Sequence, residues 1–378
     1  MNGSRIEAVD RDGAGAHARA WRDLSARALE PNVFAEPAFV LSALRNFAGA
    51  DRLQLLLAWR SGADERLIGA VVLQFPKLSL GLGVARVWQS NQAGLAALML
   101  DRDAAEEALA AVMDWIARER PGIIGLLVPS LDTTGPTARA VQALGSHKTA
   151  PARVVARRGR AVLNAAEGVA QGFEAALPKK RLKEWSRQLR RLHERGVAAF
   201  RIASDGAAVE SFLALEAKGW KGAQRTALGA NADLAAFTRS MLAGFAEDGK
   251  LAIHLLEIDG APVAAGLVLR SGPRAFYWKT AYDETYAEYS PGLQLTLELS
   301  RRQERDASIA TTDSCAIEGH PMIDRLWRAK LALADMLLPM RPDSQPRLAL
   351  WTMADDIRKR LRESAKRLIN PLRGRKRS

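Results

Sequence analysis

Residues 276–298 read FYWKTAYDETYAEYSPGLQLTLE, and this stretch decides the fold that the sequence predicts. Its aromatic and β-branched first residues are typical of a strand. Ser290-Pro291-Gly292 ends the strand, and the leucines that follow predict a helix to about residue 306 with Ser290 as its N-cap. Such a turn points backbone N–H groups and the positive end of a helix dipole toward an anion. We expect a phosphate-bearing ligand here; the alternative is an ordinary buried connection.

The same order of elements occurs twice in the chain. LQLLLAWRSGADERLIGAVVLQF (residues 53–75) and LAIHLLEIDGAPVAAGLVLRS (residues 251–271) each read as an apolar strand, a glycine-containing turn and a second apolar strand. Helices are predicted before each hairpin, and a strand and a helix after it. We therefore expect an α/β (α+β) chain with two copies of one fold, joined by a basic helix at 178–195.

The repeat sets the predicted domain limits. The first copy has no counterpart of the Ser-Pro-Gly turn and is expected to be structural. The predicted parts are a first copy at 1–165, basic linker helices at 166–196, a second copy with the ligand site at 197–351, and a basic tail at 352–378. Smaller elements are a hairpin around Gly159 at 154–163, a helix at 321–333 and a last strand at 348–351.

Two segments carry the positive charge of the chain. Residues 179–195 hold eight Lys and Arg against two Glu, and residues 358–378 hold ten against one. Together they carry +15, whereas the whole chain carries +13, so the remainder is close to neutral at −2. The positive net charge therefore comes from these two segments, and the rest of the chain is not basic.

Length and cysteine content bound the class of protein. The 378 residues are enough for two or three domains, and the one cysteine, Cys315, excludes an internal disulfide framework. The first residues have no apolar run typical of a signal peptide, and no stretch is long and apolar enough to cross a membrane. We expect a soluble, cytoplasmic protein. The five His and one Cys are scattered, so no metal site is expected.

Three strings carry a resemblance to a known family: LEAKGWKGAQRTAL (residues 215–228), YWKTAYDETYAEYSPGLQL (277–295) and DSCAIEGHPMIDRLW (313–327). They resemble the CelD/BcsL-like acetyltransferases, a bacterial family associated with cellulose biosynthesis. The order of elements resembles the GNAT acyltransferase fold, and its repetition resembles the Fem-type, double-GNAT arrangement. The resemblance implies an N- or O-acyltransferase that takes acetyl-CoA or another acyl-CoA as donor.

The resemblance also implies which residues hold the donor. In GNAT enzymes the turn before the phosphate-facing helix binds the CoA pyrophosphate, and the matching residues here are Ser290, Gly292, Leu293 and Gln294. This turn departs from the usual glycine-rich pattern, because it has one glycine and its proline removes a backbone donor. Lys279, on the preceding strand, is expected to neutralise acyl or phosphate charge; its alternative is an exposed strand position.

Acyl transfer from a thioester needs a base for the acceptor, an oxyanion stabiliser and an acid for the leaving thiolate. We favour Asp313 and His320 as bases, since both lie in the third string, and Tyr289 as an acid. The alternatives are a turn carboxylate for Asp313 and a helix-start residue for His320. Cys315 is expected to be an inert buried residue and not a nucleophile. Further candidates are the bases Glu257, Glu318 and Asp324 and the acids Tyr282 and Tyr286.

The acceptor is expected beside Trp220, Lys221 and Tyr282, which would supply aromatic walls and a cation. The alternative for Trp220 is a buried anchor of its loop. The resemblance implies an acceptor with an amine or a hydroxyl, such as a sugar or a polysaccharide precursor.

Both basic segments are predicted helices with an apolar stripe. In the first, Leu182, Trp185, Leu189 and Leu192 share one face, and the cations opposite suit CoA phosphate, an anionic glycan, tRNA or simply solvent. In the tail, Thr352-x-x-Asp355 resembles a capping box, and Ile357, Leu361, Leu368 and Ile369 share one face. A basic amphipathic helix of this kind lies on anionic membranes, whereas the alternative is a frayed soluble tail. The tail lacks the interleaved aromatics of a nucleic-acid binder.

Three functions follow from these observations. The first is an acyl-CoA-dependent acyltransferase, for which the resemblance implies a place in exopolysaccharide or cellulose biosynthesis. The second keeps the fold and takes the acyl group from aminoacyl-tRNA, as Fem-type proteins do. The third is a non-catalytic accessory protein that docks on a membrane-bound polysaccharide synthase through its tail.

Overall fold

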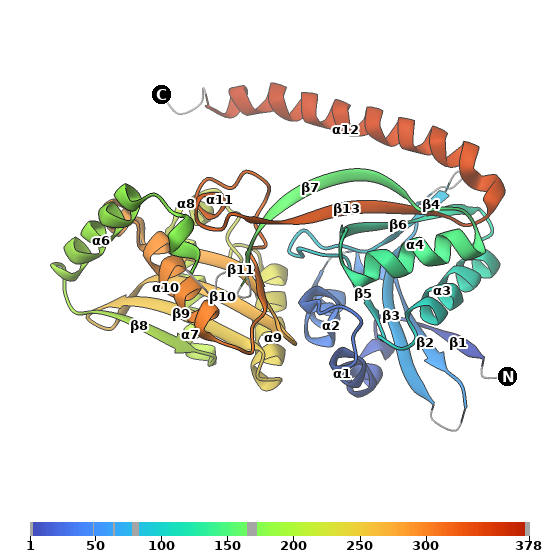
Figure 1. Ribbon diagram of the computed structural model, residues 1–378, viewed down its shortest axis with the longest axis horizontal. Helices are drawn as coiled ribbons and strands as arrows, with labels where there is room; N and C mark the ends of the chain where they lie inside the picture. Colours follow the sequence, from blue (N-terminus) through green and yellow to red (C-terminus); the bar gives the residue numbers. More distant parts are fainter. Residues whose placement is uncertain (1–2, 48, 63–64, 78–82, 165–171, 375–378) are drawn as a thin grey trace.

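The computed structural model describes residues 3–47, 49–62, 65–77, 83–164 and 172–374. One mixed sheet runs through these residues from one end of the molecule to the other (Figure 1). Its strand order is β1-β2-β3-β4-β6-β13-β7-β12-β11-β10-β9-β8, with β5 paired to β3. The strands are β1 (Ser4–Val9), β2 (Leu53–Arg60), β3 (Arg66–Gln74), β4 (Gly83–Val87), β5 (Leu98–Leu100), β6 (Ile123–Asp132), β7 (Arg153–Asn164), β8 (Ala198–Ala203), β9 (Leu251–Ile258), β10 (Ala261–Ser271), β11 (Arg274–Tyr282), β12 (Thr311–Asp313) and β13 (Ala329–Pro339).

The two halves of the sheet repeat one pattern. From one edge inward, β1 to β4 pair antiparallel and β4 then pairs parallel with β6. From the other edge, β8 to β11 pair antiparallel and β11 pairs parallel with β12. A parallel pair needs a crossover connection, and α3 (Ala105–Glu119) and α10 (Pro291–Arg305) provide it. The predicted repeat of one α/β fold is confirmed.

The halves exchange their last strands. β7 follows the first half in sequence but pairs with β12 of the second, and β13 follows the second half but pairs with β6 of the first. β7 and β13 also pair with each other, which makes the sheet continuous. The predicted linker at 166–196 begins with residues 166–171, which lie outside the described residues, and the domain limits at 165 and 197 stay a proposal.

Helices pack on both faces of the sheet. α1 (Ala18–Ala26) and α2 (Pro37–Asn46) of the first half share one core with α7 (Gly206–Lys218) and α9 (Ala232–Glu247) of the second. Edge-to-face contacts run through this core from Phe276 to Phe34, Phe39 and Phe237, with ring centroids 5.3 to 5.5 Å apart. On the opposite face, α3 and α4 (Pro136–Lys148) cover the first half, and α10 and α6 (Lys179–His193) cover the second.

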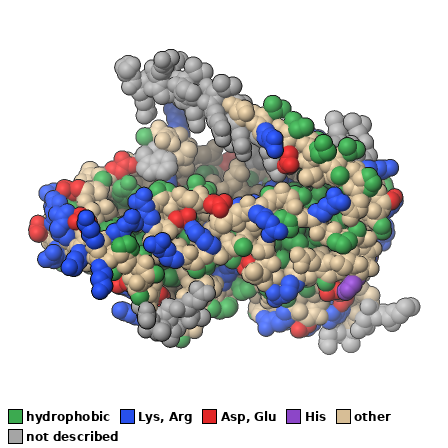
Figure 2. All heavy atoms as spheres, turned by 45° about the horizontal axis from the view of Figure 1, so that its top comes forward, with side chains coloured by type: hydrophobic (Ala, Val, Ile, Leu, Met, Phe, Trp, Pro, Cys, Tyr) green, Lys and Arg blue, Asp and Glu red, His purple; other side chains and the backbone are tan. Residues whose placement is uncertain are grey.

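The basic helix predicted at 178–194 is α6. Leu192 of its apolar stripe is fully buried, and Leu182, Trp185 and Leu189 are partly buried against the second half. Figure 2 shows Lys and Arg side chains gathered at the left end of the molecule, where α6 lies in Figure 1. The stripe therefore holds the helix in place and leaves its cations at the surface.

Three local predictions are wrong. Residues 154–163 lie within the single strand β7 and do not form a hairpin. The helix predicted at 321–333 is one turn long, α11 (Ile323–Leu326), and is followed by β13. Residues 348–351 lie in the long helix α12 (Gln345–Gly374) and not in a strand. Short apolar runs suit a strand or a buried helix equally well, and only the partner strands decide between them.

Candidate functional site

The larger cavity opens where β11 and β12 separate. The two strands pair over three positions only, from Arg274–Thr311 to Phe276–Asp313, and the chain after Asp313 then leaves the sheet. β11 continues to Tyr282 paired only with β10, so a gap opens between its second half and residues 314–316. The N-terminus of α10 closes one end of this gap. The cavity has a volume of about 830 Å³, within the range of small-molecule sites.

The turn that the sequence singles out lies on the wall of this cavity. Ser290 has a left-handed backbone (φ 52°, ψ 54°), and its carbonyl oxygen accepts hydrogen bonds from the amides of Leu293 (2.9 Å) and Gln294 (3.1 Å). Pro291 has no N–H, so Gly292 keeps the one amide of this first turn that bonds to none of the described residues. A Cβ on Gly292 would lie 3.3 Å from the Tyr282 ring, which explains why a glycine fits here. An anion therefore finds one free amide and the positive end of the helix dipole.

Cations near the turn supply positive charge to an anion site in which the turn itself offers one free amide. Arg181 of α6 and Arg325 of α11 line the cavity, and neither forms an ion pair with a described residue. Lys221, in the short helix α8 (Trp220–Ala223), also lines it, although its ammonium is held by Glu216 (2.8 Å) and by the Thr280 carbonyl (3.1 Å). Free guanidinium groups beside a helix N-terminus fit the phosphates of a CoA-type donor.

Lys279 points into the junction of two cavities. It lines the larger one together with Trp278, Cys315 and Ala316, and the same four residues line a smaller one of about 270 Å³. Burial, and then the charge of Lys221, lower the pKa of Lys279 from its ordinary value of 10.5. Its ammonium lies 5.4 Å from the centroid of the Trp278 ring and forms no ion pair with the described residues. A partly buried, unpaired cation of this kind is available to a developing negative charge.

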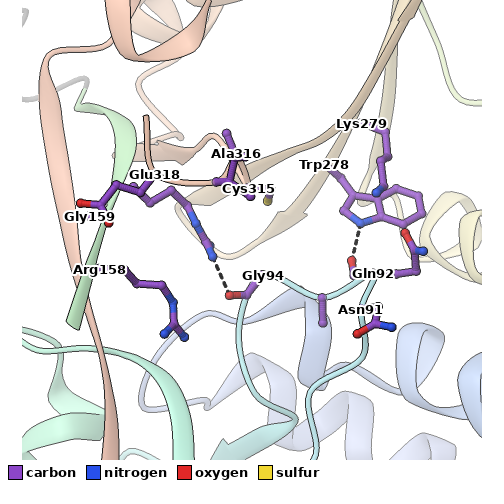
Figure 3. A pocket seen from close by; sticks show the side chains of 13 residues that line it. Asn91, Gln92, Gly94, Arg158, Gly159, Trp278, Lys279, Cys315, Ala316 and Glu318 are labelled. Atoms are coloured by element: carbon purple, nitrogen blue, oxygen red, sulfur yellow. Dashed lines mark hydrogen bonds between the residues drawn. The ribbon is translucent and has the colours of Figure 1, made fainter. Parts of the chain in front are cut away.

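The smaller cavity lies between the two halves of the molecule (Figure 3). The loop at 91–94 and β7 border it from the first half, and β11 and residues 315–318 border it from the second. The Trp278 indole donates to the Gln92 carbonyl oxygen (2.7 Å), and Arg160 donates to that of Gly94 (2.8 Å). Figure 3 shows Glu318 beside Gly159 on one side, Lys279 on the other, and Cys315 between them. Glu318 is exposed and makes no hydrogen bond or ion pair with the described residues.

Asp313 lies in neither cavity. It is fully buried and accepts hydrogen bonds from Arg160 (3.1 and 3.3 Å) and Arg274 (3.2 Å), and from the Cys315 amide (2.8 Å). Arg274 also reaches Glu30, at 3.4 Å. These partners come from both halves of the molecule. The geometry therefore favours a structural role for Asp313, as the centre of a network that joins the halves, and not the predicted role as a base.

His320 lines the larger cavity but is held as a helix-start residue. Its Nδ1 accepts from the amides of Met322 (3.4 Å) and Ile323 (3.3 Å), at the start of α11. Burial lowers the pKa of His320, which favours the neutral ring. Since Nδ1 acts as an acceptor, the proton of a neutral ring lies on Nε2. The side chain is therefore arranged to donate a hydrogen bond from Nε2, not to act as the predicted base.

Cys315 is a protonated thiol in this arrangement. Burial, and then the nearby Asp313 carboxylate, raise the pKa of Cys315 far above its ordinary value of 9.0. A thiol that keeps its proton is a poor nucleophile. Like Ser290, Cys315 has a left-handed backbone (φ 53°), so two strained non-glycine residues border the larger cavity.

Of the remaining predicted residues, some line the wall of the larger cavity and others lie outside it. Ser290, Gly292, Leu293 and Tyr282 line the larger cavity. Gln294 is buried and donates to the Trp185 carbonyl (2.9 Å), so it ties α10 to α6. Tyr289 is buried outside the cavity, under the Arg191 guanidinium. For Trp220 only the backbone is described, in α8.

Sequence reasoning missed two contributors to this site, Arg181 and Arg325, and did not favour a third, Glu318. The sequence does not distinguish Arg181 from the other cations of the basic helix. It gives no signal for Arg325 within the third string, although both residues line the larger cavity. Glu318 was one of five candidate bases. Of the other carboxylates, Glu257 pairs with Arg201 (2.8 Å) and Asp324 with Lys330 (2.8 Å). No cluster of His, Cys, Asp or Glu that could hold a metal occurs among the described residues.

A family model described as an acetyltransferase (GNAT) domain matches residues 179–316. Residues 179–316 form a GNAT acetyltransferase domain. The protein is therefore an acyltransferase, and the GNAT fold implies an acyl-CoA donor. The matched segment includes β11, the turn at Ser290 and α10, which together border the larger cavity. Membership of the narrower CelD/BcsL-like family stays a proposal. A search of curated proteins finds no match.

Solved structures of low sequence identity share the fold over most of the chain. A FemX structure is 11% identical, covers 92% of this chain and 100% of its own, and has a TM-score of 0.53. The C-terminal domain of a putative lysylphosphatidylglycerol synthetase from Agrobacterium fabrum is 11% identical, covers 90% and 96%, and has a TM-score of 0.50. A conserved protein of unknown function from Bacteroides thetaiotaomicron is 9% identical, covers 85% and 97%, and has a TM-score of 0.52. At these identities the likeness concerns the fold alone.

Proposed function

We propose that the GNAT domain transfers an acyl group from acyl-CoA in the larger cavity to an amine or hydroxyl that enters through the smaller one. The observation that carries this proposal is the shared wall of the two cavities at Trp278, Lys279, Cys315 and Ala316. A donor on one side and an acceptor on the other would meet at Lys279. The larger cavity has room for a pantetheine arm, and the smaller one for a single sugar-sized group.

The residues around this wall supply the groups that the reaction needs. Arg181, Arg325 and the Gly292 amide would hold the donor phosphates at the mouth of the larger cavity. Lys279 would stabilise the oxyanion as the acceptor adds to the thioester carbonyl. The free carboxylate of Glu318 would take the proton of the acceptor, and the neutral His320 ring would donate a hydrogen bond from Nε2–H to the sulfur that leaves as a thiolate.

The acceptor class follows from the smaller cavity. Two amides (Asn91 and Gln92), three cations (Arg158, Arg160 and Lys279) and the Glu318 carboxylate line it. The Gln92 side-chain oxygen is buried without a hydrogen-bond partner among the described residues. Such a polar lining suits a hydroxyl-rich group. A sugar or polysaccharide precursor meets this description, and we propose a place in exopolysaccharide or cellulose biosynthesis and membership of the CelD/BcsL-like family. We also propose that the protein works at the inner face of a membrane, with residues 352–378 as the contact.

Thermal unfolding with a panel of acyl-CoAs tests the donor. A ligand that binds only the folded state at about 100 times its Kd stabilises it by about 2.7 kcal/mol and raises the melting temperature. We expect this rise for the wild type and for Arg187→Ala, which removes an arginine of α6 outside the cavity. Arg181→Ala and Arg325→Ala should bind at least about tenfold more weakly, since each removes a charge-assisted contact.

The panel also separates the competing functions. The basic α6 beside the larger cavity favours aminoacyl-tRNA as the second candidate donor. If no acyl-CoA raises the melting temperature, and an aminoacyl-tRNA binds with an affinity that falls steeply with salt, the tRNA-dependent reaction replaces the first proposal. The GNAT domain argues against a purely non-catalytic accessory protein.

A further inference from the structure

α12 presents an apolar stripe that no part of the described chain covers. Seven large hydrophobic side chains are exposed among the described residues, and four of them lie on this helix. Leu350, Met353, Ile357 and Leu361 are between 58% and 65% exposed. They follow at spacings of 3, 4 and 4, which places them on one face of the helix. The side chains of Leu368 and Ile369, predicted on the same face, lie outside the described residues.

The stripe points away from the body of the protein. The start of α12 is anchored by Leu348, which is fully buried, and by Trp351, which is half-buried. Both pack on an apolar cluster formed by β4, β6 and β13. At about 100° per residue, Leu348 and Trp351 lie on the side of the helix opposite to Leu350 and Met353. The exposure of the stripe therefore follows from how the helix is docked.

The position of α12 makes the stripe accessible along its length. The helix extends from the end of β13 over the top of the molecule, above β7 and toward the second half (Figure 1). No helix of the described residues is apolar enough over a sufficient length to cross a membrane. α12 thus has the geometry of a helix that lies on a surface rather than through it.

The charge of α12 selects the kind of surface. Arg347, Arg358 and Arg360 are exposed and flank the stripe on both sides. Residues 358–378 carry ten Lys and Arg against one Glu. Two copies of this segment would repel each other in a helix-to-helix dimer. An anionic bilayer instead offers acyl chains to the stripe and phosphate groups to the arginines.

We propose that α12 is a membrane-surface anchor that binds anionic phospholipid through Leu350, Met353, Ile357 and Leu361. The stripe enters the boundary between headgroups and acyl chains, and the flanking arginines contact the phosphates. This proposal specifies the residues of the membrane contact assigned above to 352–378, and it is independent of the acyl-transfer chemistry because no residue of the stripe lines either cavity.

Vesicle sedimentation of the full chain tests the anchor. We expect the wild type to sediment with vesicles of equal parts phosphatidylcholine and phosphatidylglycerol, and to bind phosphatidylcholine vesicles at least about tenfold more weakly. The triple variant Met353→Gln, Ile357→Gln, Leu361→Gln keeps the charge and the helix propensity, and should lose about tenfold or more of the binding to the mixed vesicles.

A matched control removes an aliphatic side chain elsewhere. Val197 is 76% exposed outside α12, so Val197→Gln should bind the mixed vesicles as the wild type does. Melting temperatures equal to that of the wild type would show that all variants are folded. The proposal is overturned if the triple variant sediments as well as the wild type, if the wild type ignores the anionic lipid, or if the wild type is a dimer that the triple variant converts to monomers.

Discussion

Replacement of the buried carboxylate at Asp313 separates a structural role from a catalytic one. Asp313→Asn removes the negative charge between Arg160 and Arg274, which are both 9% exposed as side chains. Arg160 is then left without a counter-charge, and Arg274 keeps only its contact with Glu30 at 3.4 Å. Loss of one partner of a buried pair costs about 3–5 kcal/mol. Asparagine keeps one acceptor oxygen, so we expect a loss near the lower end, about 3 kcal/mol. This loss corresponds to more than about 100-fold in the unfolding equilibrium.

Urea unfolding followed by tryptophan fluorescence measures this loss. A matched control is Glu210→Gln, which breaks the exposed pair of Glu210 with Arg239 and should change the free energy of unfolding by no more than about 0.5 kcal/mol. Below the unfolding transition, folded Asp313→Asn should retain its transfer activity. The reasoning is refuted if Asp313→Asn unfolds at the urea concentration of the wild type while its transfer activity is lost.

Four other variants test the proposed chemistry and one buried titratable group. Lys279→Met should lower kcat by about 10²–10³, as loss of an oxyanion donor does. Because the pKa of Lys279 is lowered, wild-type activity should fall with rising pH below 10.5, and Lys279→Arg should abolish that fall; an unchanged alkaline limb in the arginine variant would exclude the assigned role. Glu318→Gln should lower kcat by about 10² without a change in melting temperature, since the side chain is exposed, and full activity in this variant would remove Glu318 as the base. Burial lowers the pKa of His254 from 6.5 to about 4, so between these values the unfolded chain binds a proton that the folded chain does not. Stability should therefore fall as the pH falls from 6.5 to 4, by about 3 kcal/mol, and His254→Gln should lack this component; equal pH dependence of unfolding in both proteins would contradict it.

The local signals of the site were readable in the sequence. Ser290-Pro291-Gly292 predicted the turn and the start of α10, and both are present. The hairpins at 53–75 and 251–271 predicted the repeat, because each pairs within itself and needs no distant partner. Pro291 also predicted an anion site with one backbone donor fewer. In the structure, Gly292 has the backbone amide of that first turn that is free to bind an anion.

The missed features depend on distant partners. β13 is a strand because β6 and β7 pair with it on either side, and the residues Ala329–Pro339 themselves do not indicate these partners. Asp313 looked like a base because its two arginines, Arg160 and Arg274, come from strands that the sequence could not place beside it. Glu318 could not be chosen among five candidates until the pairing of the others was known. Charge, periodicity and turn chemistry are local, whereas burial and ion pairing belong to the assembled sheet.

A crystal structure of the protein with CoA would show where the donor binds. We expect the pyrophosphate at the Gly292 amide between Arg181 and Arg325, and the thiol in contact with Lys279 at the junction of the two cavities. CoA bound away from the N-terminus of α10, or with its thiol outside that junction, would contradict this expectation.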